Sequence, residues 1–394
     1  PNLICVDMGG TSFDMSLIIN GKPSVTNETE QEYIPLLIPL VDIHTIGAGG
    51  GSVAWLENEA LRVGPRSAGA NPGPACYGKE GKEPTVTDAN LFLGRLGKES
   101  KLGGWMELDI NASENVLDSL SKKLKISPIE LAEGILSIIN AKMADAIRTI
   151  TVKEGIDPRE FSLVAFGGAG SMHAVWLAEE LEINEIIVPN DPGTFSAWGM
   201  LQTDIRRDLT VNFYQNFQSL EQKKLLENYN KLKEEATELL KSENVTEADM
   251  NFSLTADMRY IGQEYYVNVQ LIEPFNLEEI NKNFHNTYEK QYGHSTPEGP
   301  CEFINLRLIA LGKIQKSGSI KSAEKETDIT DTKREVIFNQ ITHHTNVLSR
   351  QKIKTNNKFK GPAVIEESTA TTVVPPNYNI LKDDFGNIII SKDK

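Results

Sequence analysis

The chain has 394 residues, with 55 acidic and 40 basic side chains and a formal net charge of −15. This length provides core for two or three domains, and the negative charge argues against nucleic acid as a ligand because its phosphates would be repelled. No apolar run approaches the roughly 18 residues that a membrane-spanning helix needs. The three cysteines are widely spaced and form neither a disulfide framework nor a zinc pattern. We therefore expect a cytoplasmic protein that binds neither nucleic acid nor a membrane.

The first segment with a chemical signature joins two apolar runs through an acid, two glycines and two hydroxyls. Residues 7–14 read Asp-Met-Gly-Gly-Thr-Ser-Phe-Asp, which predicts a strand, a tight turn and a returning strand. Glycine lets the backbone approach a ligand closely, and successive N–H groups in such a turn accept anions. Asp7 could then hold a divalent cation beside a bound phosphate. An ordinary Gly-Gly hairpin is the alternative, and Asp14 is expected to stabilise the hairpin rather than bind metal.

A second glycine cluster follows at residues 45–52, Thr-Ile-Gly-Ala-Gly-Gly-Gly-Ser, and is preceded by Asp42 and His44. Histidine titrates near neutrality, so His44 is a candidate acid–base or metal residue; a hydrogen-bonded histidine at a strand end is the alternative. Asp42 could bind a metal ion together with Asp88, which precedes an apolar helical segment. For Asp88, capping of that helix is the other interpretation.

The Gly/Pro-rich stretch between residues 64 and 78 does not read as core. Arg66 within it could clamp a phosphate or a substrate carbonyl through two hydrogen bonds, or it could be a plain surface arginine. No base can be assigned to Cys76, which is therefore expected to be a small buried side chain.

The third glycine cluster, residues 167–170, lies between a predicted strand and a predicted helix. Ser171 is a plausible cap for this helix. His173 in its first turn is expected to face solvent, and contact with a nucleotide is the alternative. A dinucleotide fingerprint is excluded, because His173 stands where the third glycine is required. The elements predicted around the cluster are a helix over Pro128–Thr151, strands over Leu163–Phe166 and Glu185–Val188, and a helix over Met172–Leu181. Alternation of helices and apolar strands predicts an α/β lobe over residues 1–205.

Residues 206–394 differ in character and predict an α+β C-terminal domain with a β-rich tail. The predicted elements are helices over 219–242 and Asn276–Tyr292, strands over Phe252–Tyr260, Glu264–Leu271 and Glu302–Leu311, a polar loop over Lys313–Lys333, and strands from Val336 onward.

The order and spacing of these motifs resemble the hydantoinase A/5-oxoprolinase family, which includes N-methylhydantoinase A and the acetone carboxylase beta subunit. The matching segments are residues 7–14, 47–52, 64–70, 72–78, 84–90, 166–170 and 257–263, so the resemblance covers nearly the whole chain. It implies the fold of actin, sugar kinases and chaperone ATPases, in which ATP lies between two ribonuclease H-like lobes.

The resemblance also implies roles for individual residues. The cofactor-binding set is a second phosphate hairpin at Gly9, Gly10, Thr11 and Ser12 and an adenosine loop at Gly167, Gly168 and Gly170. The other candidates are a substrate loop at Gly49, Gly50, Gly51 and Ser52, catalytic residues Asp7, His44 and Arg66, and Mg²⁺ (or Mn²⁺ or Zn²⁺) ligands Asp7, Asp42 and Asp88. There is no second Asp-x-Gly-Gly-Thr, and the chain begins at Pro1 without an initiator methionine. We therefore expect a C-terminal portion of a longer polypeptide, without the lobe that carries the first phosphate hairpin.

For function, the resemblance implies ATP-dependent opening of a cyclic amide or imide, of the hydantoin or 5-oxoproline type, through phosphorylation of a carbonyl oxygen. A hydantoinase B-type subunit or domain is the expected partner, and an oligomer is expected. Two alternatives stay open. An ATP-dependent ketone carboxylase subunit would share every motif, whereas a non-catalytic nucleotide-binding or assembly module would not need the segments at 45–52 and 66–78.

Overall fold

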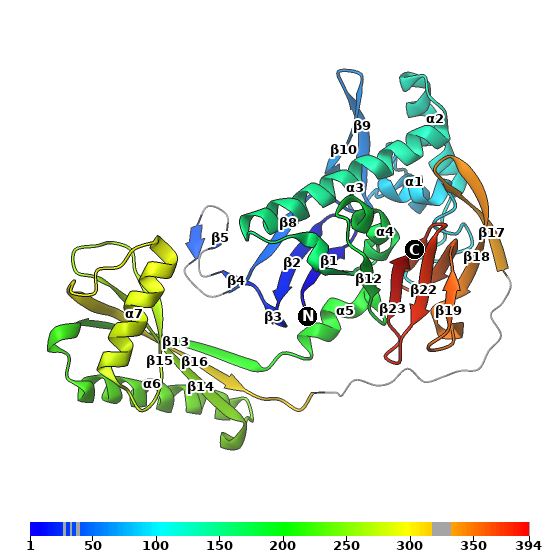
Figure 1. Cartoon of the computed structure of the whole chain (residues 1–394). Coiled ribbons are helices and arrows are strands. Elements are labelled where there is room, and N and C mark those ends of the chain that lie inside the picture. Colours follow the sequence, from blue (N-terminus) through cyan, green and yellow to red (C-terminus); the bar gives the residue numbers. More distant parts are fainter. Residues whose placement is uncertain (27–28, 32–33, 37–39, 317–331, 394) are drawn as a thin grey trace. The chain divides into compact units, whose positions relative to one another are not determined.

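The structure is a computed structural model that describes residues 1–26, 29–31, 34–36, 40–316 and 332–393. The chain divides into two compact units (Figure 1). The first unit comprises Pro1–Trp198 with Ser319–Lys394, and the second comprises Gly199–Gly318. Within the described residues, the helices are all too short or too polar to cross a membrane.

The first unit is built on one large mixed sheet. Its strand order is β19-β22-β23-β12-β11-β1-β2-β3, and β8 also pairs with β2. The strands are β1 (Leu3–Met8), β2 (Phe13–Ile19), β3 (Lys22–Pro23), β8 (Ile43–Ile46), β11 (Ser162–Phe166), β12 (Glu185–Val188), β19 (Lys358–Lys360), β22 (Tyr378–Lys382) and β23 (Ile388–Lys392). The central strand β1 runs parallel to β11 and antiparallel to β2, so the turn after β1 and the loop after β11 meet at one edge of the sheet.

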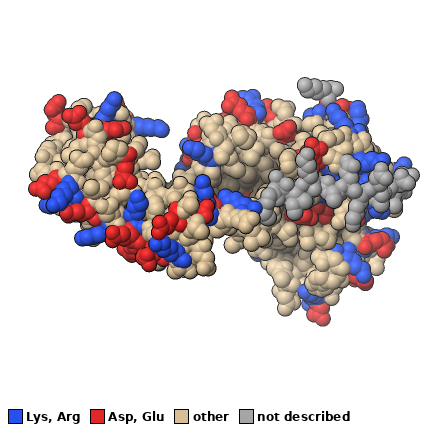
Figure 2. Space-filling model, turned by 90° about the horizontal axis from the view of Figure 1, so that it is seen from below, with Lys and Arg blue, Asp and Glu red and all other residues tan. Residues whose placement is uncertain are grey.

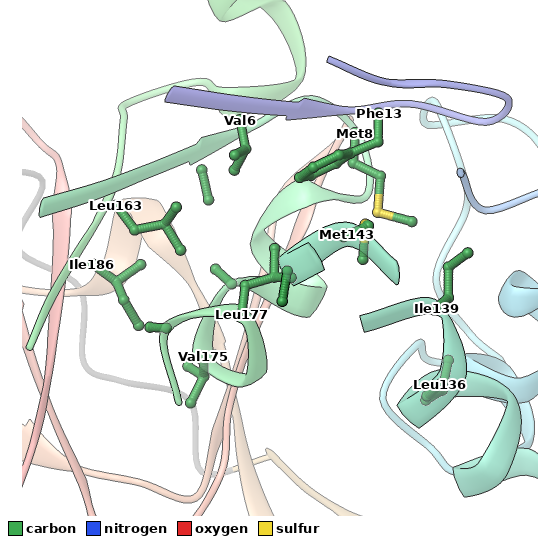
Figure 3. Close-up of a cluster of buried hydrophobic side chains, with 14 of the residues drawn as sticks. Val6, Met8, Phe13, Leu136, Ile139, Met143, Leu163, Val175, Leu177 and Ile186 are labelled. Carbon is green, nitrogen blue, oxygen red and sulfur yellow. The ribbon is translucent and has the colours of Figure 1, made fainter. Parts of the chain in front are cut away.

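Period-two alternation divides the residues of β1 between the two faces of the sheet. Ile4, Val6 and Met8 are fully buried, and they belong to a core shared with α3 (Pro128–Lys153) and α4 (Gly170–Glu180). Figure 3 shows this core, with Val6, Met8 and Phe13 opposite Ile139 and Met143 of α3. Because Asp7 alternates with these residues, it lies on the other face of the sheet.

The long helix α3 confirms the helix predicted over Pro128–Thr151. Ser127 caps its first turn by accepting a hydrogen bond from Glu130 N, and Pro128 occupies the first helical position, where its missing N–H costs nothing. Buried residues recur every three or four positions from Leu131 to Ile150, as expected for a helix with one face against a sheet.

The rest of the first unit surrounds this sheet. It contains the short strands β4 (Val25–Thr26), β5 (Thr29–Gln31), β6 (Ile34–Leu36) and β7 (Leu40–Val41), the hairpin β9–β10 (Ser52–Glu57, Ala60–Ser67), and helices α1 (Val86–Phe92), α2 (Ile110–Leu124) and α5 (Phe195–Met200). A second sheet, in the order β17-β18-β20-β21, is formed by Thr332–Phe338, Ile341–Ser349, Ala363–Glu366 and Thr371–Val374.

The C-terminal tail differs from the expected division of the chain. Sequence analysis placed all of residues 206–394 in one C-terminal domain, whereas the tail is part of the first unit. β23 pairs antiparallel with β12 and extends the large sheet, and Ile388 and Ile390 are fully buried in the same core as Ile186. An isoleucine-rich strand gains burial by adding to a free sheet edge, but its alternation does not say which edge it joins. The loop expected over Lys313–Lys333 lies largely outside the described residues.

The second unit is a four-stranded antiparallel sheet with two amphipathic helices. The strand order is β13-β16-β14-β15. The elements are β13 (Ile205–Asn216), α6 (Gln222–Ser242), β14 (Met250–Tyr260), β15 (Val267–Leu271), α7 (Leu277–Tyr292) and β16 (Cys301–Gly312). The predicted helices and strands of this part are confirmed, and β13 is an additional strand. On the molecular face shown in Figure 2, acidic and basic side chains are interspersed.

Candidate functional site

The Gly9–Ser12 turn joins β1 to β2 at the edge of the large sheet. Gly9 N donates to Ser12 O at 3.2 Å, which closes the turn. A Cβ atom added at Gly9 or Gly10 would meet no other atom within 4 Å. The backbone of this turn therefore borders open space. Packing within the protein does not require glycine at these two positions, because a side chain would have room there.

A cavity of about 610 Å³ lies beside this turn, and the three glycine clusters meet around it. It is lined by Gly9, Gly10, Gly50, Tyr77, Thr87, Leu96, Glu99, Ser100, Lys101, Leu102, Gly103, Gly168, Ala169, Met172 and residues 366–371. The lining therefore combines exposed peptide groups, apolar side chains and carboxylates, all of them from the first unit.

The N-terminus of α4 contributes to the same cavity through Gly168 and Ala169. No side chain caps this helix end. The cap predicted at Ser171 is wrong: Ser171 is buried, and its Oγ donates instead to Thr371 O at 2.9 Å. An uncapped helix N-terminus presents N–H groups and the positive end of the helix dipole, both of which favour an anion.

Asp7 stands at the end of β1, between Gly167 and Ser196. Gly167 has φ of +82°, and a Cβ atom there would lie 2.2 Å from Asp7 Oδ1, so only glycine fits. The other carboxylate oxygen, Oδ2, accepts a 2.6 Å hydrogen bond from Ser196 Oγ. Helix α5, which carries Ser196, is held by the edge-on packing of Phe195 on Phe166, with ring centroids 5.1 Å apart.

Asp14 lies directly opposite Asp7 in the β1–β2 ladder, so the two carboxylates share one face of the sheet. Asp14 accepts hydrogen bonds from Ser12 Oγ at 3.1 Å and from Thr45 Oγ1 at 2.5 Å. These bonds tie the turn to β8, as expected of a hairpin-stabilising aspartate. The face therefore gathers two carboxylates with three hydroxyls.

His44 and Asp42 are not part of this arrangement. His44 pairs with Met15 in the β2–β8 ladder, while its neighbour Thr45 pairs with Asp14. Neighbouring residues of a strand point to opposite faces of the sheet. Thr45 therefore shares the face of Asp14 and Asp7, and His44 lies on the opposite face. Its Nε2 lies 3.3 Å from Asp42 Oδ2, and neither residue lines the cavity.

Asp88 has a structural role that leaves no room for the predicted metal ion. It is fully buried and forms a capping box with Thr85 at the start of α1. Its oxygens accept hydrogen bonds from three backbone N–H groups and two hydroxyls, those of Ala75, Cys76, Thr85 (N and Oγ1) and Ser113. Burial, reinforced by the Asp88 charge, raises the pKa of the Cys76 thiol far above its ordinary value, which keeps this thiol protonated.

The predicted substrate loop, Gly49–Ser52, is buried rather than open. Gly50 N and Gly51 N donate to Gly9 O and Gly10 O at 3.0 and 2.7 Å. A Cβ atom at Gly49 would lie 2.6 Å from Gly10 C and from the backbone nitrogen of the next residue. These glycines therefore allow two loops to pack backbone against backbone, and only Gly50 reaches the cavity.

Arg66 lies outside the cavity lining, on the β9–β10 hairpin. Its guanidinium pairs with Glu83 at 2.7 Å and lies 5.1 Å from the Trp55 ring centroid, and its side chain is half exposed. The part of the chain that the structure describes contains no group of three or more His, Cys, Asp or Glu side chains able to hold a metal ion. The predicted set of Asp7, Asp42 and Asp88 is thus not brought together.

Two segments of the cavity wall were not identified from the sequence. One is the β20–β21 connection at residues 366–371, and the other is the loop at residues 96–103. Ser100 Oγ donates to Glu366 Oε1 at 2.8 Å, linking the two segments. Glu367 forms a buried ion pair with Arg350 at 2.9 Å; burial raises the pKa of Glu367, against the opposing effect of Arg350. No local signal marks these residues, because the β20–β21 connection reaches the site through sheet pairing and residues 96–103 contact a segment that is distant in the sequence.

Comparison with known proteins gives a consistent result. Residues 1–209 match the family model described as hydantoinase/oxoprolinase, and residues 212–390 match the model of its C-terminal domain. The chain is 34% identical to caprolactamase subunit alpha of Pseudomonas jessenii, over 97% of this chain and 57% of that protein.

Two solved structures share this fold. The structure of an ATP-dependent caprolactamase from Pseudomonas jessenii matches with a TM-score of 0.78 and 32% identity, over 100% of this chain and 59% of that one. A nucleotide-free acetone carboxylase matches with a TM-score of 0.87 and 24% identity, over 99% and 58% of the two chains. The fold class expected from the sequence is thereby confirmed. The chain spans little more than half the length of these relatives.

Proposed function

The chain belongs to the hydantoinase/oxoprolinase family, and on that premise we propose that it forms the nucleotide-binding half of an ATP-dependent enzyme that opens a cyclic amide. One observation carries the proposal: the Gly9–Gly10 turn and the uncapped N-terminus of α4 border the same cavity. Both features present peptide N–H groups, which suit the phosphates of a nucleotide. Apolar residues such as Leu96 and Met172 on the same lining suit a base.

The proposed chemistry makes the amide carbonyl carbon more electrophilic. The carbonyl oxygen attacks the γ-phosphorus, and the bond between that phosphorus and ADP breaks. Water then adds to the carbonyl carbon, the ring C–N bond breaks as the nitrogen takes up a proton, and a second water releases inorganic phosphate from the acyl phosphate that remains. Catalysis of such a transfer is mainly positioning and charge stabilisation. Asp7 is not among the residues that line the cavity, but it precedes the Gly9–Gly10 turn by two residues. The proposal places its carboxylate, fixed by Ser196 and Gly167, beside the reacting phosphate.

Magnesium is part of this proposal, and the residues on the open face of the sheet fit it. Mg²⁺ prefers oxygen ligands and is held by one or two carboxylates together with water and phosphate. Asp7 supplies a carboxylate for this role, in place of the three-residue set expected from the sequence. Asp14, which lies opposite it on the same face, keeps its hairpin-stabilising role, with both oxygens accepting from hydroxyls. Bound beside Asp7, the ion would neutralise charge on the transferring phosphoryl group.

The substrate class and the partner are proposed from the relatives. The 34% identity to a caprolactamase subunit alpha supports a lactam or related cyclic amide as substrate. The word subunit in that name supports a second, hydantoinase B-type chain or domain and an oligomeric assembly.

Calorimetric titration with ATP–Mg²⁺ tests the nucleotide site. A methyl group at Gly10 would meet no protein atom within 4 Å and would project into the space that the proposal gives to a phosphate. Gly10→Ala is therefore expected to keep its thermal stability and to lose about tenfold or more in affinity, equivalent to about 1.4 kcal/mol. Gly199→Ala is the matched control, since its Cβ also meets open space but lies outside the cavity lining. Equal ATP affinity in the wild type and Gly10→Ala would contradict the assignment.

Turnover in the full-length protein with its partner tests the reaction. ATP hydrolysis is expected to rise when a lactam, a hydantoin or 5-oxoproline is added. Stimulation only by a ketone with bicarbonate would indicate the carboxylase, and a rate that no substrate changes would indicate a nucleotide-binding module.

A further inference from the structure

One wall of the cavity carries a fixed carboxylate to which the reaction above gives no role. Glu366, at the end of β20, lines the cavity. Its Oε1 accepts a hydrogen bond from Ser100 Oγ and another from Arg334 Nη1, both at 2.8 Å. Since both bonds end on the same oxygen, Oε2 keeps its capacity to accept.

The carboxylate is held in place before any ligand arrives. The Arg334–Glu366 pair is only 22% and 28% exposed, and Ser100 approaches it from a segment 266 residues away in the sequence. A polar group already fixed by its neighbours loses little conformational freedom when a ligand binds. Glu366 is therefore a preorganised acceptor rather than a mobile surface glutamate.

Its neighbours define which part of a nucleotide it would meet. Ser100, which bonds Glu366, lies between Leu96 and Leu102 in the sequence, and these two leucines line the cavity together with the charged Glu99 and Lys101. On its other side, Glu366 is three residues from Thr369, a span of at most about 11 Å. The Thr369 carbonyl lies 3.4 Å from a Cβ position at Gly168. Glu366 thus connects the apolar wall with the glycine loop beside the helix terminus.

We propose that Glu366 accepts hydrogen bonds from the ribose hydroxyls of the bound nucleotide, and that it selects ribonucleotides over 2′-deoxyribonucleotides. The inference rests on the proposed function. A nucleoside phosphate presents its base, its ribose diol and its phosphates in that order, which matches the apolar wall, the carboxylate and the glycine loop. Oε2 of Glu366 has two lone pairs and can accept from both hydroxyls, and hydrogen bonds to a charged acceptor are among the stronger ones.

The test compares ligands and variants in one calorimetric series. ATP, 2′-deoxy-ATP and ITP, each with Mg²⁺, are titrated into the wild type, Glu366→Ala, Glu366→Gln, Ser100→Ala and Glu154→Ala. The wild type is expected to bind ATP about tenfold or more tightly than 2′-deoxy-ATP. Glu366→Ala should bring this ratio close to one by weakening ATP binding alone, and Glu366→Gln should give an intermediate ratio. Ser100→Ala removes one of the two bonds that fix the carboxylate and should lower the ratio by less than Glu366→Ala. Glu154→Ala, an exposed glutamate outside the cavity lining, is the control and should keep the wild-type ratio.

Thermal unfolding of each variant checks that it is folded, and Glu366→Gln, which preserves the side-chain volume, carries the test if the alanine variant does not fold. An unchanged ratio in the Glu366 variants would overturn the inference. So would a variant effect confined to the comparison of ATP with ITP, because the carboxylate would then read the base amino group. If Gly10→Ala weakens ATP binding but the Glu366 variants keep the wild-type ratio of affinities for ATP and 2′-deoxy-ATP, this inference alone is overturned. Absence of ATP binding in the wild type would overturn the proposed function as well.

Discussion

Ser196 donates a 2.6 Å hydrogen bond to Asp7 although 189 residues separate the two in the sequence. The bond links the end of β1 to helix α5, which the Phe195–Phe166 ring contact holds against the sheet. With Gly167 packed on the opposite carboxylate oxygen, Asp7 has a fixed position at the sheet edge.

Ser196→Ala is expected to lower kcat for ATP hydrolysis by about tenfold to a hundredfold, because a hydrogen bond to a charged group contributes about 1.5–3 kcal/mol. The effect should fall on kcat more than on KM if the bond positions Asp7 for the transition state. Steady-state kinetics of the full-length protein measures both. Ser196→Thr retains the hydroxyl and should recover most of the rate; a threonine variant as slow as the alanine variant would argue against positioning through this bond.

Two glycines are expected to matter for folding rather than for ligand binding. In Gly49→Ala and Gly167→Ala the new Cβ atom would lie 2.6 and 2.2 Å from existing atoms, so the backbone must shift at a cost of about 1–3 kcal/mol or more. Urea unfolding measures this loss. Gly10→Ala is the control and should unfold like the wild type; equal stability of all three variants would contradict the packing described for these loops.

Asp88→Ala is expected to reduce the free energy of unfolding by about 3 kcal/mol or more, because it leaves several buried donors without an acceptor. The loss should be the same with and without added Mg²⁺, since Asp88 has no room for a cation. Asp42→Ala, at a position that is 19% exposed and pairs with His44 at 3.3 Å, provides the comparison and should cost much less. A Mg²⁺-dependent stability difference between the wild type and Asp88→Ala would restore the metal role.

His173 predicts an acid-sensitive contribution to stability. Burial, with a smaller effect from Arg95, lowers the pKa of His173 from 6.5 to about 3, and its Nδ1 lies 2.7 Å from Asn140 Oδ1. Between these two pH values the unfolded chain binds one proton more than the folded chain. Stability therefore falls as the pH drops below 6.5, by up to about 1.4 kcal/mol per pH unit.

Urea unfolding at about pH 7 and about pH 5 measures this dependence. His173→Gln should reduce the difference in stability between the two pH values, whereas His344→Gln, at an exposed strand position, should leave it unchanged. The same pH dependence in the wild type and His173→Gln would show that other groups cause it.

Local sequence signals were sufficient for the elements predicted above, though not for β13, and for the glycine turns that border the cavity. The 3.6-residue spacing of α3 and the Gly-Gly turn after β1 depend on neighbouring residues alone, so their positions could be predicted. The same signals failed for side-chain direction in the first turn of α4. There, Ser171 was expected to cap the helix and His173 to face solvent, but both are buried beneath segments that are distant in the sequence.

The sequence by itself determined the fold class, the family and the glycine segments that border the cavity. Each of these was recognised from short motifs, whose residues are neighbours in the chain, and from the order of those motifs. Only the tertiary structure decided which candidates share a site. The register of β8 against β2 places His44 and Asp7 on opposite faces of the sheet. Asp88 is buried and forms the capping box of α1. Sheet pairing brings the β-rich tail back to the first unit, with Glu366 on the cavity wall. Each of these outcomes depends on the surface that is buried when distant segments pair. The local pattern of one segment does not show which other segment it will pair with.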